Sequence, residues 1–267
     1  MTRLSKDPNQ PGEAAADPGV WHEHLRIHSY DADFQLRASP EALSRAFLEA
    51  AWNHAEHLGV GHSELARQEK LWVLGRLLLQ IDRWPRWGDK VRIRTWPRGI
   101  NGAFALRDFE IFHENETRLV GGSSSWLVLD ASTHRPQRIN KLLQNLPAPV
   151  TRMALGREPS KLGLVPTPAA SITREVRYSD VDVNRHVNSA RYIGWLLDSY
   201  DHEFHRNHSL HSLEVNFLAE TLWPDSVSVK SQAQTTATFA HSIVNSSQQE
   251  VLRAELTWKA ESNLPRQ

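Results

Sequence analysis

The sequence has no cysteine among its 267 residues. That absence excludes disulfides, thiolate zinc sites, iron–sulfur clusters and a cysteine nucleophile. Covalent catalysis would therefore need Ser, Thr, Lys or a carboxylate as the nucleophile. No Walker A or G-x-G-x-x-G sequence occurs either, so no motif points to a nucleotide cofactor. We expect a protein that works without a cofactor.

Long apolar runs are also missing. Nowhere does the chain offer the roughly 18 apolar residues of a membrane span, and residues 1–20 contain no apolar stretch that would serve as a secretory signal. That opening segment is rich in Pro, Gly, Ala and acidic residues, which predicts a disordered tail. We therefore expect a cytoplasmic protein without a membrane span.

Charge of one sign is not in excess, because 31 Lys and Arg residues balance 31 Asp and Glu residues. A neutral chain has no overall field to hold nucleic acid, so nucleic acid is not an expected partner. Hydrophobic residues make up 40% of the chain and charged residues 23%, which is typical of globular proteins. A core can form, and the length suits one large domain or two of moderate size.

The same order of predicted elements occurs twice along the chain. Ser39-Pro40-Glu41 has the N-cap, first-position proline and first-turn acid of a helix start, and four strand-like runs follow that helix. After a proline-rich stretch, a strand at 171–178, a helix at 188–205 and four more strands repeat this order. The pattern predicts an α+β fold of two units, each an antiparallel sheet around one long helix, with the sheets joined edge to edge. The predicted division is a first domain at 21–140, a linker at 141–170 and a second domain at 171–262.

The richest set of reactive side chains precedes the second predicted helix. Two acids, two amides and an imidazole fall within nine positions: Asp180, Asp182, Asn184, His186 and Asn188. In an extended loop, Asp182, Asn184 and His186 would project to one side, beside the unpaired N–H groups of a helix start. The alternative is that these side chains only form turns and cap the helix. Histidines at steps of three near residues 202–211 have no matching carboxylates, so we predict no metal.

The loop sequence resembles a known signature. Asp182-Val-Asn-Arg-His-Val-Asn-Ser-Ala-Arg-Tyr-Ile-Gly-Trp is similar to the motif of acyl-acyl carrier protein (acyl-ACP) thioesterases of plant plastids and bacteria. Other segments fall in that family's order: Arg26-Ile-His-Ser-Tyr, Leu71-Trp-Val-Leu-Gly-Arg, Trp84-Pro-Arg-Trp-Gly-Asp and Trp126-Leu-Val-Leu-Asp. The resemblance implies two fused hot-dog domains, the second of which hydrolyses a fatty acyl thioester. This agrees with the repeated order of elements.

The resemblance also implies the site residues. The family's loop residues fall on Asp182, Asn184 and His186, and its catalytic Glu falls on Glu220, on the strand after the helix. Glu220 and Asn184 would activate a water, while Asp182 and His186 orient and polarise Asn184. The helix start near Asn188 would offer N–H groups to the oxyanion. His186 stays open as the base, and the plain alternative for Glu220 is an ordinary acid at a strand end.

One position departs from the family. Plant members commonly have Cys after the catalytic Glu, where this chain has Thr221, so a thiolate mechanism is not available. Two other functions stay open, an acyl-CoA thioesterase and a non-catalytic protein that binds an acyl carrier. The intact site residues argue against the second, whereas CoA hydrolases can share this kind of loop. Acyl chain length, saturation and oligomeric state, including a homodimer, also stay open.

An acyl carrier protein is the partner that the resemblance implies, and such carriers are acidic. Arg92 and Arg94 alternate with apolar residues and should share the exposed face of a strand, so we predict that they dock the carrier. Their alternative is an ordinary solubilising role. The first domain is expected to have no catalytic centre and to shape an acyl pocket instead. Its candidate lining residues, for which core packing is the alternative, are Phe47, Ala50, Ala51 and Trp52.

Overall fold

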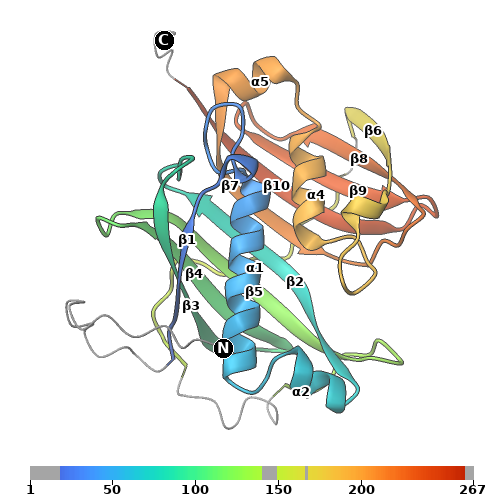
Figure 1. The fold of residues 1–267 in the computed structure, drawn as a ribbon. Coiled ribbons are helices and arrows are strands. Elements are labelled where there is room, and N and C mark those ends of the chain that lie inside the picture. The colour runs from blue at the N-terminus through green and yellow to red at the C-terminus, as the bar shows by residue number, and fades with distance from the viewer. Residues whose placement is uncertain (1–18, 140–148, 166–167, 262–267) are drawn as a thin grey trace.

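The computed structural model describes residues 19–139, 149–165 and 168–261 (Figure 1). Most of the predicted tail, and the parts of the predicted linker at 141–148 and 166–167, lie outside the described residues. The strands are β1 (Trp21–Arg26), β2 (Lys70–Ile81), β3 (Lys90–Asn101), β4 (Phe104–His113), β5 (Arg118–Asp130), β6 (Ala170–Glu175), β7 (His208–Phe217), β8 (Ser226–Ala233), β9 (Thr238–Asn245) and β10 (Glu250–Ala260). The helices are α1 (Pro40–His57), α2 (His62–Arg67), α4 (Ser189–Leu197) and α5 (His202–Asn207), with short 3-10 turns η1 (Ser29–Asp31) and η2 (Tyr178–Asp180).

One antiparallel sheet runs through the whole molecule in the order β1-β3-β4-β5-β2-β7-β10-β9-β8-β6. The first five strands in this order come from the first half of the chain and the last five from the second half. They meet at β2 and β7, which pair antiparallel, with Leu77 opposite Val215 and Leu79 opposite Leu213. The predicted edge-to-edge joining of two sheets is confirmed, and within the described residues β1 and β6 form the two edges of the joined sheet.

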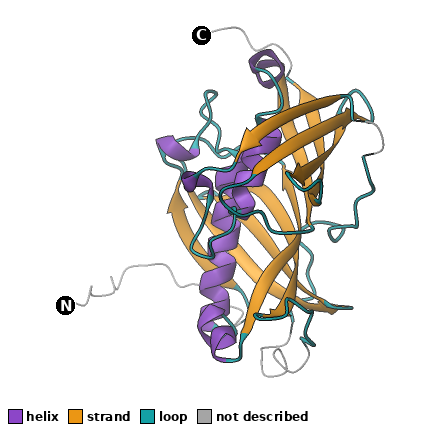
Figure 2. Ribbon diagram, turned by 90° about the vertical axis from the view of Figure 1, so that its right-hand side faces the viewer, coloured by secondary structure: helices purple, strands orange, loops and turns teal. Residues whose placement is uncertain are grey.

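The helices cover one face of this sheet (Figure 2). Helix α1 begins as predicted, because the Ser39 side chain accepts the N–H of Ala42 and Pro40 occupies the first helical position. Its buried side packs on the first-half strands, where the Phe47 ring stacks 4.7 Å from that of Phe109 on β4. Helix α4 packs on the second half and lies beside α1. Among the described helices, none combines the length and apolar content needed to cross a bilayer.

The second long helix differs from the prediction. A single helix was expected at 188–205, but α4 ends at Leu197 and α5 begins at His202. The break arises because the Asp201 side chain accepts the N–H of Phe204 at 2.7 Å and so starts a new helix. The prediction of one continuous helix is therefore wrong, and the short helix α2 was not predicted at all.

The segment at 149–165 crosses the sheet face that the helices leave uncovered (Figure 2). On this face the Ser160 hydroxyl donates to the buried Glu214 carboxylate at 2.8 Å, and the Asn216 carboxamide donates to the Ser160 carbonyl at 2.9 Å. Arg76 on β2 donates to the Pro159 carbonyl at 3.2 Å. Since Glu214 and Asn216 lie on β7, this segment spans the junction between the two halves of the sheet.

Candidate active site

The candidate residues lie on the loop between β6 and α4, and Asp180 ties the two ends of this loop together. The Asp180 Oδ2 atom accepts the backbone N–H of Arg177 at 2.8 Å, and its backbone carbonyl accepts the N–H of Asn188 at 2.9 Å. Asn188 then caps α4, because its side-chain oxygen accepts the N–H of Ala190 at 2.9 Å. The loop therefore closes at the N-terminus of α4, where the helix dipole favours negative charge.

Asp182 folds the tip of the loop. Its Oδ1 atom accepts the N–H of Asn184 at 2.9 Å, and its own N–H donates to the His186 carbonyl at 3.0 Å. Arg185 has a φ of +65°, in the left-handed region, which lets the chain reverse at this point. Asp182 thus fixes the backbone of Asn184 and does not contact its carboxamide. Its influence on that carboxamide is therefore more indirect than the predicted orienting role.

His186 and Glu220 meet although they are far apart in the sequence. The His186 Nε2 atom lies 3.1 Å from Glu220 Oε2, and the side chains are 33% and 40% exposed. The N–H of Val187 donates to the carbonyl of Thr221 at 2.9 Å, so the loop is also fixed to this segment by its backbone. The structure thus places the predicted loop beside the end of β7, with an imidazole and a carboxylate within reach of solvent.

Asn184 completes the predicted set. Its side chain is exposed, and its carboxamide makes no hydrogen bond within the described part of the chain. An exposed amide with open donors and acceptors suits the binding of a water or a carbonyl group. That Asn184 and Glu220 share one water remains a prediction.

Thr221, the residue after Glu220, faces the interior. The residue is 1% exposed, and its hydroxyl oxygen is buried. The nearby Tyr192 on α4 is 3% exposed, and burial raises the pKa of its phenol to about 12, so this group stays neutral. Neither hydroxyl is accessible to a substrate. The accessible reactive groups at this place are therefore His186, Glu220 and Asn184.

Arg191 was not among the residues predicted to belong to the site. The structure places its Nε atom 3.0 Å from Asp180 Oδ1, so its guanidinium holds the base of the loop. Its position in the sequence could have indicated this role. Arg191 is three residues after the cap Asn188, and side chains at that place point back toward the preceding turn.

The predicted acyl-pocket residues do not share one face of α1. Phe47, Ala50 and Ala51 are buried, and the Phe47 ring occupies the space where Gly122 has no side chain. Trp52 is 43% exposed and stacks on His62 of α2 at 5.2 Å. Because successive residues of a helix point about 100° apart, the neighbour of a buried Ala51 faces outward here. Trp52 therefore lies on a different side of α1 from the three buried residues, and a role for these four residues in an acyl pocket stays a prediction.

The predicted docking arginines share a strand face, as expected, but both have acidic partners. Arg94 Nη2 lies 2.9 Å from Glu110 Oε2, and Arg92 pairs with Glu116. The guanidinium of Arg94 also lies 4.1 Å from the centre of the Phe112 ring. Each arginine side chain is only 22% exposed. Their positive charge is therefore largely compensated within the protein itself.

Both halves of the chain match the domain models of one protein family. Residues 18–145 match the model of the acyl-ACP thioesterase N-terminal domain, and residues 168–260 match that of the acyl-ACP thioesterase C-terminal domain. The acyl-ACP hydrolase FATB2 of Cuphea viscosissima is 28% identical over 81% of this chain, and oleoyl-ACP thioesterase 2 of Arabidopsis thaliana is 26% identical over 84%. These alignments cover 56% and 66% of the two relatives, so the chain spans little more than half of the first.

Two solved structures share this fold over most of the chain. An acyl-ACP thioesterase from Bacteroides thetaiotaomicron superposes with a TM-score of 0.79 at 23% identity, covering 91% of this chain and 99% of its own. The 12:0-ACP thioesterase from Umbellularia californica gives a TM-score of 0.80 at 23% identity, covering 91% and 98%. This likeness shows the fold, which is the predicted pair of fused hot-dog units.

Proposed function

The chain belongs to the acyl-ACP thioesterase family, and from this premise we propose that it hydrolyses fatty acyl thioesters of an acyl carrier protein. The products are a free fatty acid and the carrier thiol. The observation that carries the proposal is the contact between His186 and Glu220, 3.1 Å apart beside the N-terminus of α4. An accessible carboxylate, an imidazole and the positive end of a helix dipole together suit acyl transfer to water.

In the proposed reaction, Glu220 and the carboxamide of Asn184 hold a water. Glu220 takes a proton from this water as its oxygen bonds to the thioester carbonyl carbon. The carbonyl oxygen becomes an oxyanion beside the N-terminus of α4, whose dipole stabilises the negative charge. The C–S bond then breaks, and the proton passes from Glu220 to the carrier thiolate. His186 holds Glu220 by a hydrogen bond, and Asp182 fixes Asn184 through the backbone.

Single replacements test these roles. Glu220→Ala and Asn184→Ala should each lower kcat by about 10²–10⁴-fold, the usual scale for acid–base groups. Glu203→Ala, which removes an exposed carboxylate on α5 of the same half, is the matched control and should leave kcat unchanged. A near-normal rate for Glu220→Ala would transfer the role of base to His186.

The runner-up substrate is an acyl-CoA, and the pairing of Arg92 and Arg94 with carboxylates favours testing it. Compensated charges attract an acidic carrier protein less strongly than free ones do. The test compares kcat/KM for acyl carrier and acyl-CoA substrates across acyl chain lengths. Higher values for the carrier substrates support the proposal, and higher values for the CoA substrates replace it. The proposal assigns the chemistry to residues 171–262 and the acyl pocket to residues 21–140.

A further inference from the structure

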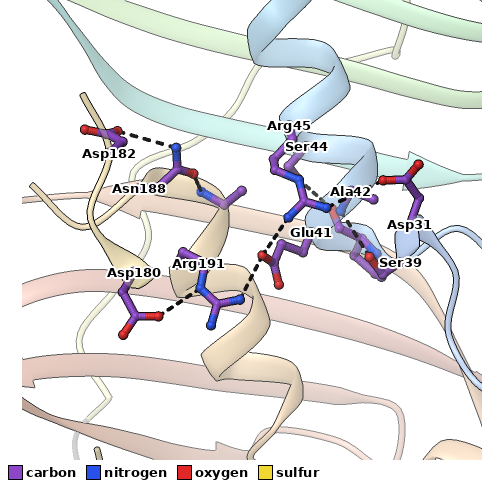
Figure 3. A network of polar contacts seen from close by, with 12 residues as sticks. Asp31, Ser39, Glu41, Ala42, Ser44, Arg45, Asp180, Asp182, Asn188 and Arg191 are labelled. Atoms are coloured by element: carbon purple, nitrogen blue, oxygen red, sulfur yellow. Dashed lines mark hydrogen bonds and ion pairs between the residues drawn. The ribbon is translucent and has the colours of Figure 1, made fainter. Parts of the chain in front are cut away.

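A chain of ion pairs joins the first half of the molecule to the loop that carries the candidate site (Figure 3). On α4, Arg191 donates from Nε to Asp180 Oδ1 and from Nη1 to Glu41 Oε1, both at 3.0 Å. Glu41 lies in the first turn of α1, and its Oε1 atom also pairs with Arg45 Nη1 at 3.0 Å. One planar guanidinium therefore links a carboxylate of each half in a fixed geometry.

The Glu41 carboxylate fits against α4 because the residue at position 194 is a glycine. A side-chain carbon at Gly194, one turn along α4 from Arg191, would stand 2.6 Å from Glu41 Oε2. That distance is well inside van der Waals contact, so the Glu41 carboxylate lies directly against the surface of α4. The side chains of Glu41 and Asp180 are 15% and 5% exposed, so both carboxylates are largely shielded from solvent, while the Arg191 side chain that joins them is 36% exposed.

The corresponding place in the first half lacks the link. Asp31 ties its own loop as Asp180 does, because its Oδ2 atom accepts the N–H of His28 at 3.1 Å and its carbonyl accepts the N–H of Ser39 at 2.7 Å. Three residues after the cap Ser39, however, stands Ala42, which has no charge to offer. The nearest cation is Arg45, whose Nη2 atom is 3.7 Å from Asp31 Oδ1 and whose side chain is 46% exposed. The strong anchor is therefore confined to the loop with the candidate site.

We propose that Glu41, on the helix of the first half, is a positioning residue for the catalytic loop of the second half and acts through Arg191 and Asp180. The inference rests on the proposed thioesterase function for its kinetic consequence. Displacing a reacting group by about 1 Å can lower a rate by as much as 10²-fold, even when the change lies away from the chemistry. The site is then completed by both halves of the chain.

The test uses two independent ways to break the same contact. Glu41→Ala removes the carboxylate, and Gly194→Ala pushes it aside without changing Glu41. Each variant should lower kcat by about 10- to 100-fold and change KM by less than about twofold. The double variant should be no slower than the slower single variant, because both changes remove one contact. Losses that multiply in the double variant would overturn the proposal.

Glu41→Gln separates positioning from a general effect on helix stability. The glutamine carbonyl can still accept the Arg191 hydrogen bond, although it no longer carries the charge that favours the start of α1. Positioning predicts a kcat near that of the native protein, whereas a helix-stability role predicts that Gln behaves like Ala. Arg45→Ala is the matched control, since it breaks the Glu41 and Asp31 pairs on the other side of the network, and it should leave kcat unchanged.

Hydrogen exchange of the loop amides gives a readout that does not depend on turnover. The N–H groups of Asp182, Val187 and Asn188 are hydrogen-bonded within the loop and to Thr221. They should exchange faster in Glu41→Ala than in Arg45→Ala, with the remaining strands unchanged. If the native protein hydrolysed no acyl thioester, the proposed function would fail while this exchange result still decided the positioning role. Equal exchange in both variants, or an unchanged kcat in a folded Glu41→Ala, would refute it.

Discussion

The loop after η1 in the first half and the loop after η2 in the second half follow the same backbone course. In both, an aspartate N–H donates to a carbonyl four residues later, from Asp33 to Arg37 at 2.8 Å and from Asp182 to His186 at 3.0 Å. The residue before that carbonyl has a φ of +62° in one loop and +65° in the other. Each loop leads into a capped helix, α1 or α4. The backbone is common to both halves and cannot by itself carry the proposed chemistry.

The chain segments that face the two loops also match. The N–H of Ala38 donates to the carbonyl of Pro85 at 2.8 Å, as the N–H of Val187 donates to the carbonyl of Thr221 at 2.9 Å. The preceding residues at these matching positions are Trp84 and Glu220. The two halves therefore present different side chains on the same frame.

Those side chains differ in kind. Where His186 faces Glu220, the first half has Arg37, whose guanidinium carbon lies 4.8 Å from the centre of the Trp84 ring. Arg37 is 7% exposed and pairs with Glu261 at 2.9 Å. A stacked and ion-paired cation fills this place, where the second half has an imidazole that faces a carboxylate. These differences support the expectation that the first half has no catalytic centre of its own. The two halves keep the same backbone at this place and differ in the side chains that it carries.

The largest effect on kcat is expected when His186 is replaced by arginine, the residue that the first half has at the matching position. His186→Arg places a permanent cation beside Glu220, which lowers the basicity of that carboxylate. We expect kcat to fall by at least about 10²-fold with little change in the thermal midpoint. The matched variant Arg37→Lys, in the first-half loop, should leave kcat within about twofold of the native value. An active His186→Arg variant would show that the site does not depend on this pair.

An acyl pocket in the first half would give the two halves different roles, binding of the acyl chain in the first and hydrolysis in the second. Leu in place of the buried Ala50 or Ala51 should shorten the preferred acyl chain, changing the ratio of kcat/KM between long and short substrates by at least about tenfold. Trp52→Leu, on the exposed side of α1, is the control and should leave this ratio unchanged. Lower stability with an unchanged preference would place the pocket elsewhere.

The two halves also differ in a buried imidazole. By strand register, His241 on β9 matches Phe109 on β4, and burial lowers the pKa of His241 to about 4. The unfolded chain binds a proton at this residue below about pH 6.5, whereas the folded chain does not until about pH 4. Stability should therefore fall on acidification across this window, by about 1.4 kcal/mol per pH unit from this residue.

Replacing His241 by phenylalanine, the residue at the matching position of the first half, tests whether His241 causes this pH dependence of stability. In His241→Phe, the fall in the free energy of unfolding between pH 6.5 and pH 4 should become less steep by about that amount. Urea unfolding at several pH values measures it. His54, a second buried imidazole whose pKa is lowered to about 3, stays in place and keeps its own share of the slope. Parallel pH curves for the native protein and the variant would contradict the assignment.

The smallest expected effect concerns carrier docking on the first half. Arg94→Glu should raise KM for an acyl carrier substrate by only about two- to fivefold, because Glu110 already compensates the native charge. Hydrolysis of a small neutral thioester should not change, and added salt should weaken only the carrier reaction. Arg67→Glu on α2, an exposed site in the same half, is the matched control. Equal salt sensitivity of both substrates would remove docking from this face and favour an acyl-CoA substrate.

Local features of the fold were predictable because nearby residues decide them. The start of α1 follows from Ser39 and Pro40, and the alternation of Arg92 and Arg94 with buried neighbours follows from the period of a strand. The break between α4 and α5 was missed, although its signal is also local. Asp201 caps a new helix there, and the apolar spacing that suggested one helix cannot show where hydrogen bonding changes.

Residue type and spacing along the chain are local properties, so the reactive groups and their place before a helix could be read from the sequence. These groups are Asp182, Asn184 and His186 on one loop and Glu220 beyond the helix. Which of them touch could not be read in this way. The His186–Glu220 contact and the link from Arg191 to Glu41 depend on how the helices and strands pack, and no spacing along the chain encodes that packing.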